Sequence, residues 1–157
     1  MARLHATAWN RYKFLLSGIV LLLPILFLYQ SLNPVFPDAL PEITVGEYSI
    51  VPMPYDLDPA YQHDGVYVKD FLLTFTAGDI HNIRQGYLNI GQEPALISEI
   101  QKSTGGEGFL HGSKHGQHVH AISKPQISTE ASIWLTIENW NGEILQARWS
   151  IPQPMLN

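Results

Sequence analysis

The chain has 157 residues, a formal net charge of −5 and no cysteine. An acidic balance disfavours binding to nucleic acid or to anionic lipid surfaces, because both carry negative charge. The lack of cysteine excludes disulfides, Cys/His zinc fingers and blue-copper sites. The charge is unevenly distributed, since residues 1–30 carry three basic and no acidic side chains, whereas residues 31–157 carry six basic and fourteen acidic ones.

Residues 14–32 are predicted to form a transmembrane helix. No charged residue lies between Phe14 and Tyr29, and with its flank the segment can cross a hydrocarbon core of about 30 Å. Pro24 is tolerated in a membrane helix, and aromatic residues such as Trp9 are typical of membrane interfaces. A cleaved signal peptide is the alternative, but its apolar region would be unusually long and no small-residue cleavage site follows.

The basic residues of the N-terminus predict the topology. Arg3, Arg11 and Lys13 precede the apolar segment, and the next basic residue is Lys69. The positive-inside rule therefore places residues 1–13 in the cytoplasm and residues 33–157 on the other side. We expect a single-pass protein of the bacterial inner membrane with a periplasmic C-terminal domain. The expected partners are the inner membrane and a membrane protein, with no nucleic acid.

The segment after the helix is predicted to be a spacer followed by a β domain. Residues 33–41 contain three prolines and are expected to be semi-rigid, which leaves residues 42–157 as the domain. A first strand is predicted over residues 43–51, which are rich in β-branched and aromatic side chains. Two prolines end or edge this strand, and Asp-Pro and Asp-Gly pairs then predict a loop over residues 55–65.

The middle of the chain predicts two more strands and one helix. Residues 66–76 form the second predicted strand, and the third surrounds residues 88–90 and stops at a glycine. Between them, Asp79 is expected to cap a helical turn that runs through Gln85. A helix is predicted over residues 93–102, which have proline in the first turn, apolar residues on one face and glycine shortly after the end.

The C-terminal third predicts a β-hairpin. Residues 133–140 and 143–151 are apolar and aromatic, and the Asn141-Gly142 pair between them favours a type I′ turn. Alternation places one apolar set on a single face of the first strand: Ile133, Leu135 and Ile137. The short strands and their spacing predict a mainly β fold, an immunoglobulin-like or cupredoxin-like β-sandwich with one short helical insert.

Four of the seven histidines lie within ten positions, at His111, His115, His118 and His120. Such a tract indicates metal binding. The H-x-H pair at 118 and 120 would point to one face of a strand. Glycines in the tract disfavour a helix, so we predict a flexible loop over residues 110–117 that leads into a strand. The loop could fold the first two histidines back over that strand.

The predicted ligands are these four histidines, and the predicted cofactor is a copper or zinc ion, because imidazole suits both metals. His63, which precedes Asp64, and His81 are weaker candidates that other loops could bring to the site. The alternative is that the tract is an exposed polar loop that binds no metal.

The sequence holds no motif of a common hydrolase, because neither a G-x-S-x-G elbow nor an H-E-x-x-H helix occurs. We therefore expect no enzyme; the alternative is a zinc hydrolase with His115, His118 and His120 as ligands. The expected function is a membrane-anchored periplasmic accessory protein that binds copper or zinc, for metal delivery or for assembly of a metalloenzyme such as an oxidase. The alternative is a structural or interaction subunit of an inner-membrane complex without a metal.

The basic N-terminus, the single span and the terminal Trp-Leu-x-Ile…Asn-Gly…Ala-Arg-Trp hairpin together resemble FixH-like proteins and periplasmic copper-handling sandwich domains. This resemblance covers the architecture and residues 133–157. It implies a tethered β-sandwich that handles copper, and it carries over no ligand residues, because the Met-rich and His-terminal motifs of the copper carriers are absent.

Overall fold

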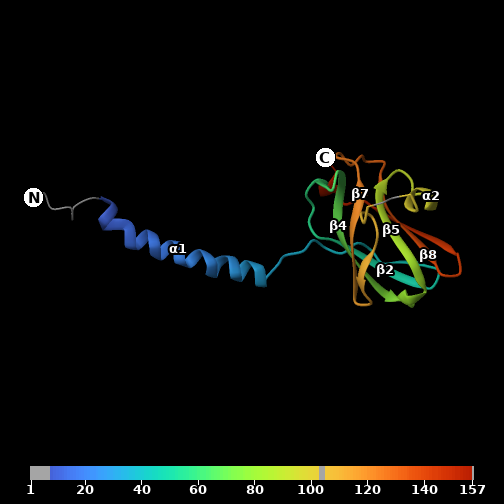
Figure 1. Ribbon diagram of the computed structural model, residues 1–157, viewed down its shortest axis with the longest axis horizontal. Helices are drawn as coiled ribbons and strands as arrows, with labels where there is room; N and C mark the ends of the chain where they lie inside the picture. The colour runs from blue at the N-terminus through green and yellow to red at the C-terminus, as the bar shows by residue number, and fades with distance from the viewer. Residues whose placement is uncertain (1–7, 103–104, 157) are drawn as a thin grey trace, which may run out of the picture. The chain divides into compact units, whose positions relative to one another are not determined.

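The computed structural model describes residues 8–102 and 105–156. The chain divides into two compact units, one that ends at Val35 and one that begins at Phe36. The first is helical and the second is mainly β (Figure 1). Residues 1–7, including Arg3 of the predicted topology signal, lie outside the described residues.

The first unit contains one helix, α1 (Ala8–Leu32), with Pro24 in its interior. The helix ends where both the backbone and the side-chain amide of Asn33 donate to the carbonyl of Tyr29, at 3.1 and 2.8 Å. The part from Tyr12 to Leu32 is long and apolar enough to cross a membrane, a test that a signal sequence near the N-terminus also passes. An apolar N-terminal helix is thus confirmed.

Among the described residues, nine strands form a single sheet. The strands are β1 (Ile43–Val45), β2 (Tyr48–Pro54), β3 (Tyr61–His63), β4 (Val66–Ala77), β5 (Ile83–Gly91), β6 (His111–Ser113), β7 (Gly116–Ser123), β8 (Ser132–Asn139) and β9 (Ile144–Ser150). Their order is β1-β2-β4-β7-β5-β8-β9, with β3 paired to β4 and β6 paired to β7. The end strands β1 and β9 lie next to each other, so the sheet nearly closes into a barrel. The mainly β class is confirmed, and the two-layered sandwich is not.

The core fills the inside of this curved sheet. Its fully buried apolar side chains come from most strands: Tyr48, Ile50, Phe71, Leu73, Leu88, Val119, Ile133, Leu135 and Ile137. Met155 of the terminal 3₁₀ turn (Gln153–Met155) adds to this core. The indole nitrogen of buried Trp149 donates to the carbonyl of Pro41 at 2.8 Å, which ties the start of the domain to its last strand.

The predicted C-terminal hairpin is confirmed, with β8 and β9 paired in antiparallel register. Its turn differs from the prediction. Gly142 has a positive φ of +83°, but Asn141 does not, and the Gly142 amide donates to the carbonyl of Asn139 at 2.9 Å. The loop is therefore longer than a two-residue type I′ turn and uses glycine for its single left-handed position.

Two expectations in the first half of the domain were wrong. The predicted strand over residues 43–51 is two strands, β1 and β2, because the chain turns at Gly46, where φ is +57°. The predicted loop over residues 55–65 contains β3, which pairs with β4 through a turn at Asp64 and Gly65. Both turn residues have positive φ, 45° and 87°, as a type I′ turn requires.

The predicted helix over residues 93–102 shrinks to α2 (Ile97–Ile100). The side chain of Asn89 accepts from the amide of Ala95 and donates to the carbonyl of Glu93, which holds the first residues of that segment out of a helix. Asp79 does cap a helical turn, by accepting from the amide of His81 at 3.0 Å. That turn covers Ile80–Asn82 and ends before Gln85, because β5 begins at Ile83.

The predicted flexible loop over residues 110–117 is instead a hairpin of β6 and β7. Gly112 is in β6 with a φ of +143°, and a Cβ atom there would lie 2.4 Å from the carbonyl oxygen of Gly116. This glycine therefore permits close approach of two backbones and is not a sign of flexibility.

Candidate metal centre

Three histidines converge on the outer face of the β6–β7 hairpin. His111 of β6 is paired in register with His118 of β7, and His120 lies two residues further along β7. Side chains two apart on a strand share a face, and the buried Val119 between them points to the core. One ring nitrogen of each histidine lies within 4.8 Å of those of the other two. The fold thus brings together three of the four predicted main ligands.

The spacing of these rings fits coordination of one ion. The ring centroid of His118 lies 4.9 Å from that of His111 and 4.6 Å from that of His120. The centroids of His111 and His120 are 6.0 Å apart. An imidazole bound at a Zn–N distance of about 2.0–2.1 Å has its centroid roughly 3.1 Å from the metal, so two ligands at a tetrahedral angle have centroids about 5 Å apart. The Nδ1 atom of His118 is hydrogen-bonded to the Nε2 atom of His111 at 2.9 Å, a contact that an ion bound by both rings would replace.

The surroundings favour the neutral form of the central ring. The pKa of His118 is lowered from its ordinary value, first by burial and then by the neighbouring rings of His120 and His111. A metal binds the neutral imidazole, so a lowered pKa reduces the competition from protons. The ring of Tyr55 packs edge-on against His118, at 5.4 Å between centroids.

A carboxylate orients the second ring of the H-x-H pair. Asp70 of β4 lies opposite His120 in the β4–β7 register, and its Oδ1 atom is 2.5 Å from Nδ1 of His120. Its Oδ2 atom accepts from the hydroxyl of Tyr61 at 2.9 Å; burial, and after it this bond, raises the pKa of Tyr61 to about 12. A hydrogen bond at Nδ1 leaves Nε2 of His120 as the metal-binding atom, an arrangement common around metal-bound histidine.

His63, a weaker candidate, lies beside this group. Its ring stacks on that of His120, with centroids 5.0 Å apart and planes inclined by 21°. Its Nδ1 atom is 2.9 Å from Oε1 of Glu107, and the hydrogen bond to this carboxylate raises the pKa of His63. One donor atom each of His63, Asp64 and Glu107 also lie within 4.8 Å of one another.

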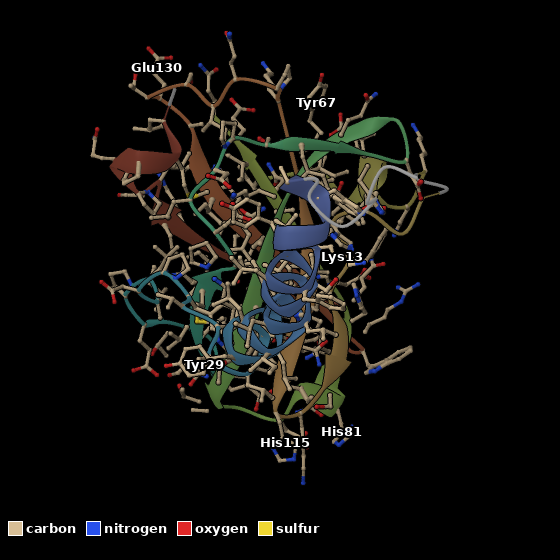
Figure 2. All side chains as sticks on the ribbon, turned by 90° about the vertical axis from the view of Figure 1, so that its left-hand side faces the viewer. Lys13, Tyr29, Tyr67, His81, His115 and Glu130 are labelled. Atoms are coloured by element: carbon tan, nitrogen blue, oxygen red, sulfur yellow. The ribbon has the colours of Figure 1, made fainter. Side chains whose placement is uncertain are left out.

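The other two predicted histidines lie elsewhere. His115 is in the exposed turn between β6 and β7, where its amide donates to the hydroxyl of Ser113. His81 is in the capped helical turn before β5. Figure 2 shows both side chains extending outward at the periphery of the molecule. Within the described part of the chain, neither belongs to a group of candidate ligands.

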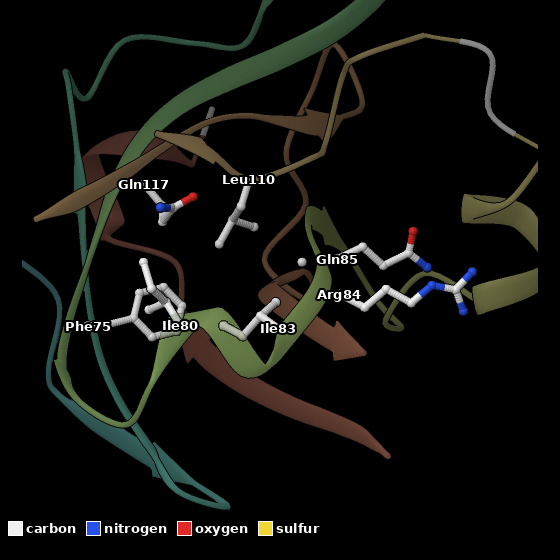
Figure 3. A pocket seen from close by; sticks show the side chains of 8 residues that line it. Phe75, Ile80, Ile83, Arg84, Gln85, Leu110 and Gln117 are labelled. Atoms are coloured by element: carbon white, nitrogen blue, oxygen red, sulfur yellow. The ribbon is translucent and has the colours of Figure 1, made fainter. Parts of the chain in front are cut away.

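Sequence reasoning did not find Asp70 or Glu107. Asp70 lies 50 positions from its histidine partner and Glu107 lies 44 positions from its own, so only the folded structure shows the contacts. The cavity of about 120 Å³ between Phe75, Ile83, Leu110 and Gln117 (Figure 3) is a separate feature, because no histidine lines it.

The fold and the site together define a mainly β protein with one apolar N-terminal helix and a surface cluster of histidines. Carboxylates contact two of these histidines, His120 and His63. The chain belongs to the family described as Uncharacterised conserved protein UCP029505, which it matches over residues 8–152. This match covers the apolar helix, all nine described strands and every residue of the cluster. No curated protein and no solved structure matches the chain.

Proposed function

We propose that this protein is a membrane-anchored accessory protein that binds a copper or zinc ion through His111, His118 and His120. The observation that carries the proposal is the convergence of three imidazoles, of which the central one has a lowered pKa and a second is oriented by Asp70. Three neutral nitrogen donors suit Cu(II) and Zn.

The exposure of the site favours delivery of the ion over catalysis. His111 is exposed, whereas His118 and His120 are half-buried on β7. Three protein ligands leave at least one coordination position open, and at the surface a ligand of a partner protein can reach it. A zinc hydrolase uses the same open position for water but also needs a general base and a substrate cleft. The proposed role is therefore metal delivery or assembly of a metalloenzyme, such as an oxidase.

The proposed location follows from the N-terminus. We infer that α1 is an uncleaved anchor in the bacterial inner membrane, since Arg3, Arg11 and Lys13 precede its uncharged stretch and no Lys or Arg follows until Lys69. The proline-rich residues 33–41 then act as a spacer, and residues 42–157 form a periplasmic domain. A tether of this kind raises the effective concentration of the domain near membrane partners. The intact mass of the protein in the membrane fraction tests the anchor, because cleavage would remove the helix.

The full-length chain, purified in detergent without a polyhistidine tag and stripped of metal, provides the test. Titration with Cu(II) and with Zn(II) should give tight binding, and the double variant His118→Ala/His120→Ala should lose the ion of the three-histidine group. The single variants His115→Ala and His81→Ala are matched controls that should bind as the wild type does. Unchanged affinity in the double variant would refute the assignment of the site.

An exposed apolar tip supports a second candidate, an interaction subunit of an inner-membrane complex that needs no metal. Trp140 is 69% exposed and Ile144 is 51% exposed, and both flank the β8–β9 turn. In this case a membrane partner should co-purify in mild detergent in the presence of a chelator, and Trp140→Ala should release it. Loss of the partner on chelation would favour the metal-dependent role.

A further inference from the structure

We propose that His63, Asp64 and Glu107 form a second site for a divalent transition-metal ion, separate from the three-histidine group. One donor atom of each residue lies within 4.8 Å of the other two. The closest pair is Nδ1 of His63 and Oε1 of Glu107, at 2.9 Å. Imidazole nitrogen and carboxylate oxygen are both ligands that zinc takes in proteins.

The carboxylate of Glu107 has a buried oxygen atom that supports a cation site. Glu107 is only 9% exposed, and its Oε2 atom is buried without a hydrogen-bond partner. A buried polar atom without a partner is rare in folded proteins and calls for an explanation such as an ion. Because Oε1 of the same group already contacts His63, an ion bound by both oxygens of Glu107 would also give Oε2 a partner.

The backbone around Glu107 holds the carboxylate in place. The amide of Gly108 donates to the carbonyl of His120 at 2.9 Å, and its carbonyl accepts from the amide of Leu88 at 2.8 Å. Gly108 has a φ of +84°, and a Cβ atom there would lie 2.3 Å from the ring of Tyr87. This segment is therefore fixed between β5 and β7, so the carboxylate needs little ordering when an ion binds.

The β3–β4 turn supplies the other two ligands. His63 is the last residue of β3, and Asp64 follows it in the turn with a φ of 45°. The side chain of Asp64 is exposed, so the site opens to solvent on this side and an ion can enter. The two carboxylates give the site a formal charge of −2, which balances one divalent cation.

The donor sets distinguish the two sites. The His111, His118 and His120 group offers three imidazole nitrogens, whereas the second site offers one nitrogen and carboxylate oxygens, which are harder ligands. The stack of His63 on His120, with centroids 5.0 Å apart, makes the sites neighbours. We assign zinc to the second site, and this assignment does not depend on which metal the three-histidine group binds.

The number of zinc ions bound by the full-length chain in detergent tests the inference. The metal-stripped wild type should bind two Zn(II) per chain by titration calorimetry. Glu107→Gln, which keeps the size of the side chain but removes its charge, should bind one. His118→Ala/His120→Ala should lose the other ion, and Glu93→Gln, at an exposed position, should keep both.

Thermal unfolding in chelator checks that Glu107→Gln is folded. If it is not, Asp64→Asn serves instead, because asparagine tolerates a positive φ, and it should weaken the second ion at least tenfold. A wild type whose single bound ion is kept by Glu107→Gln, a Glu107→Gln variant that keeps two ions, or one ion lost equally in both sets of variants would overturn the second site. Loss of only the three-histidine ion would leave the second site standing, so the two assignments fail separately.

Discussion

Asp70→Asn isolates the contribution of a residue that orients a metal ligand without binding the metal itself. The change keeps the shape of the side chain and one carbonyl oxygen, but it removes the charge that faces Nδ1 of His120. That oxygen can accept from Tyr61 or from His120, but it cannot replace both carboxylate contacts. The tautomer that presents Nε2 of His120 to a metal is then less favoured.

The expected loss of metal affinity follows from comparable metal sites. Removal of an outer carboxylate typically weakens metal binding by about 10–100-fold, which corresponds to about 1.4–2.8 kcal/mol. At a metal concentration one hundred times the wild-type Kd, binding stabilises the wild type by about 2.7 kcal/mol and the variant by only about 0.4–1.4 kcal/mol. With about 4 °C per kcal/mol for a domain of this size, the metal-induced rise in Tm falls from about 11 °C to about 2–6 °C.

Thermal unfolding followed by circular dichroism, with Cu(II) or Zn(II) and with chelator, measures this difference. The Tm in chelator reports the direct effect of the substitution on the fold, so the metal-induced rise is compared within each protein. Glu93→Gln serves as the control, because it removes an exposed carboxylate that makes no contact with the histidines. An Asp70→Asn variant with the wild-type rise would show that the carboxylate does not orient a ligand.

Three further predictions concern stability. The pKa of His118 is lowered in the folded protein, so this residue contributes stability that is lost as the pH falls below about 6.5. The free energy of unfolding of metal-free His118→Ala, measured with denaturant, should therefore fall less over this pH range than that of the wild type. The ammonium of Lys69, which is 1% exposed, pairs with the carboxylate of Asp56 and donates to the carbonyl of Asp58. Asp56→Ala leaves it only the carbonyl and should destabilise the domain by about 3 kcal/mol; an unchanged urea midpoint would contradict this. Trp149 is 2% exposed and Trp140 is 69% exposed. Trp149→Ala should therefore lower the free energy of unfolding by about 3–5 kcal/mol, and Trp140→Ala by less than about 0.5 kcal/mol. Equal losses on chemical unfolding would refute this contrast.

The elements predicted correctly are those with strong local signals. The hairpin of β8 and β9 was predictable from alternation, because Ile133, Leu135 and Ile137 all point to the core. The apolar stretch of α1 was predictable from composition alone. The predictions were wrong where a tertiary contact overrides the local preference. The side chain of Asn89, for example, binds the backbone at Glu93 and Ala95 and shortens the predicted helix.

Glycine caused the error at the histidine tract. Gly112 looked like a sign of a flexible loop, but the close approach of β6 to the backbone of Gly116 is what requires it. The same-face position of His118 and His120 depends only on the strand period, so it could be predicted. The carboxylate of Asp70 could not, because its position opposite His120 depends on the register of two strands that are 50 residues apart.

Two of the three histidines belong to a central strand of the sheet, and the third belongs to a short exposed strand. His118 and His120 belong to β7, which lies between β4 and β5 in the sheet. His111 belongs to β6, a strand of three exposed residues that pairs with β7. Short, exposed elements with few buried contacts open locally at low free-energy cost. Opening β6 would remove one of three ligands without disturbing the barrel, and a partner's ligand could then take its place. A site that must release its ion needs such an asymmetry, whereas a permanent structural site would place all three ligands on rigid strands.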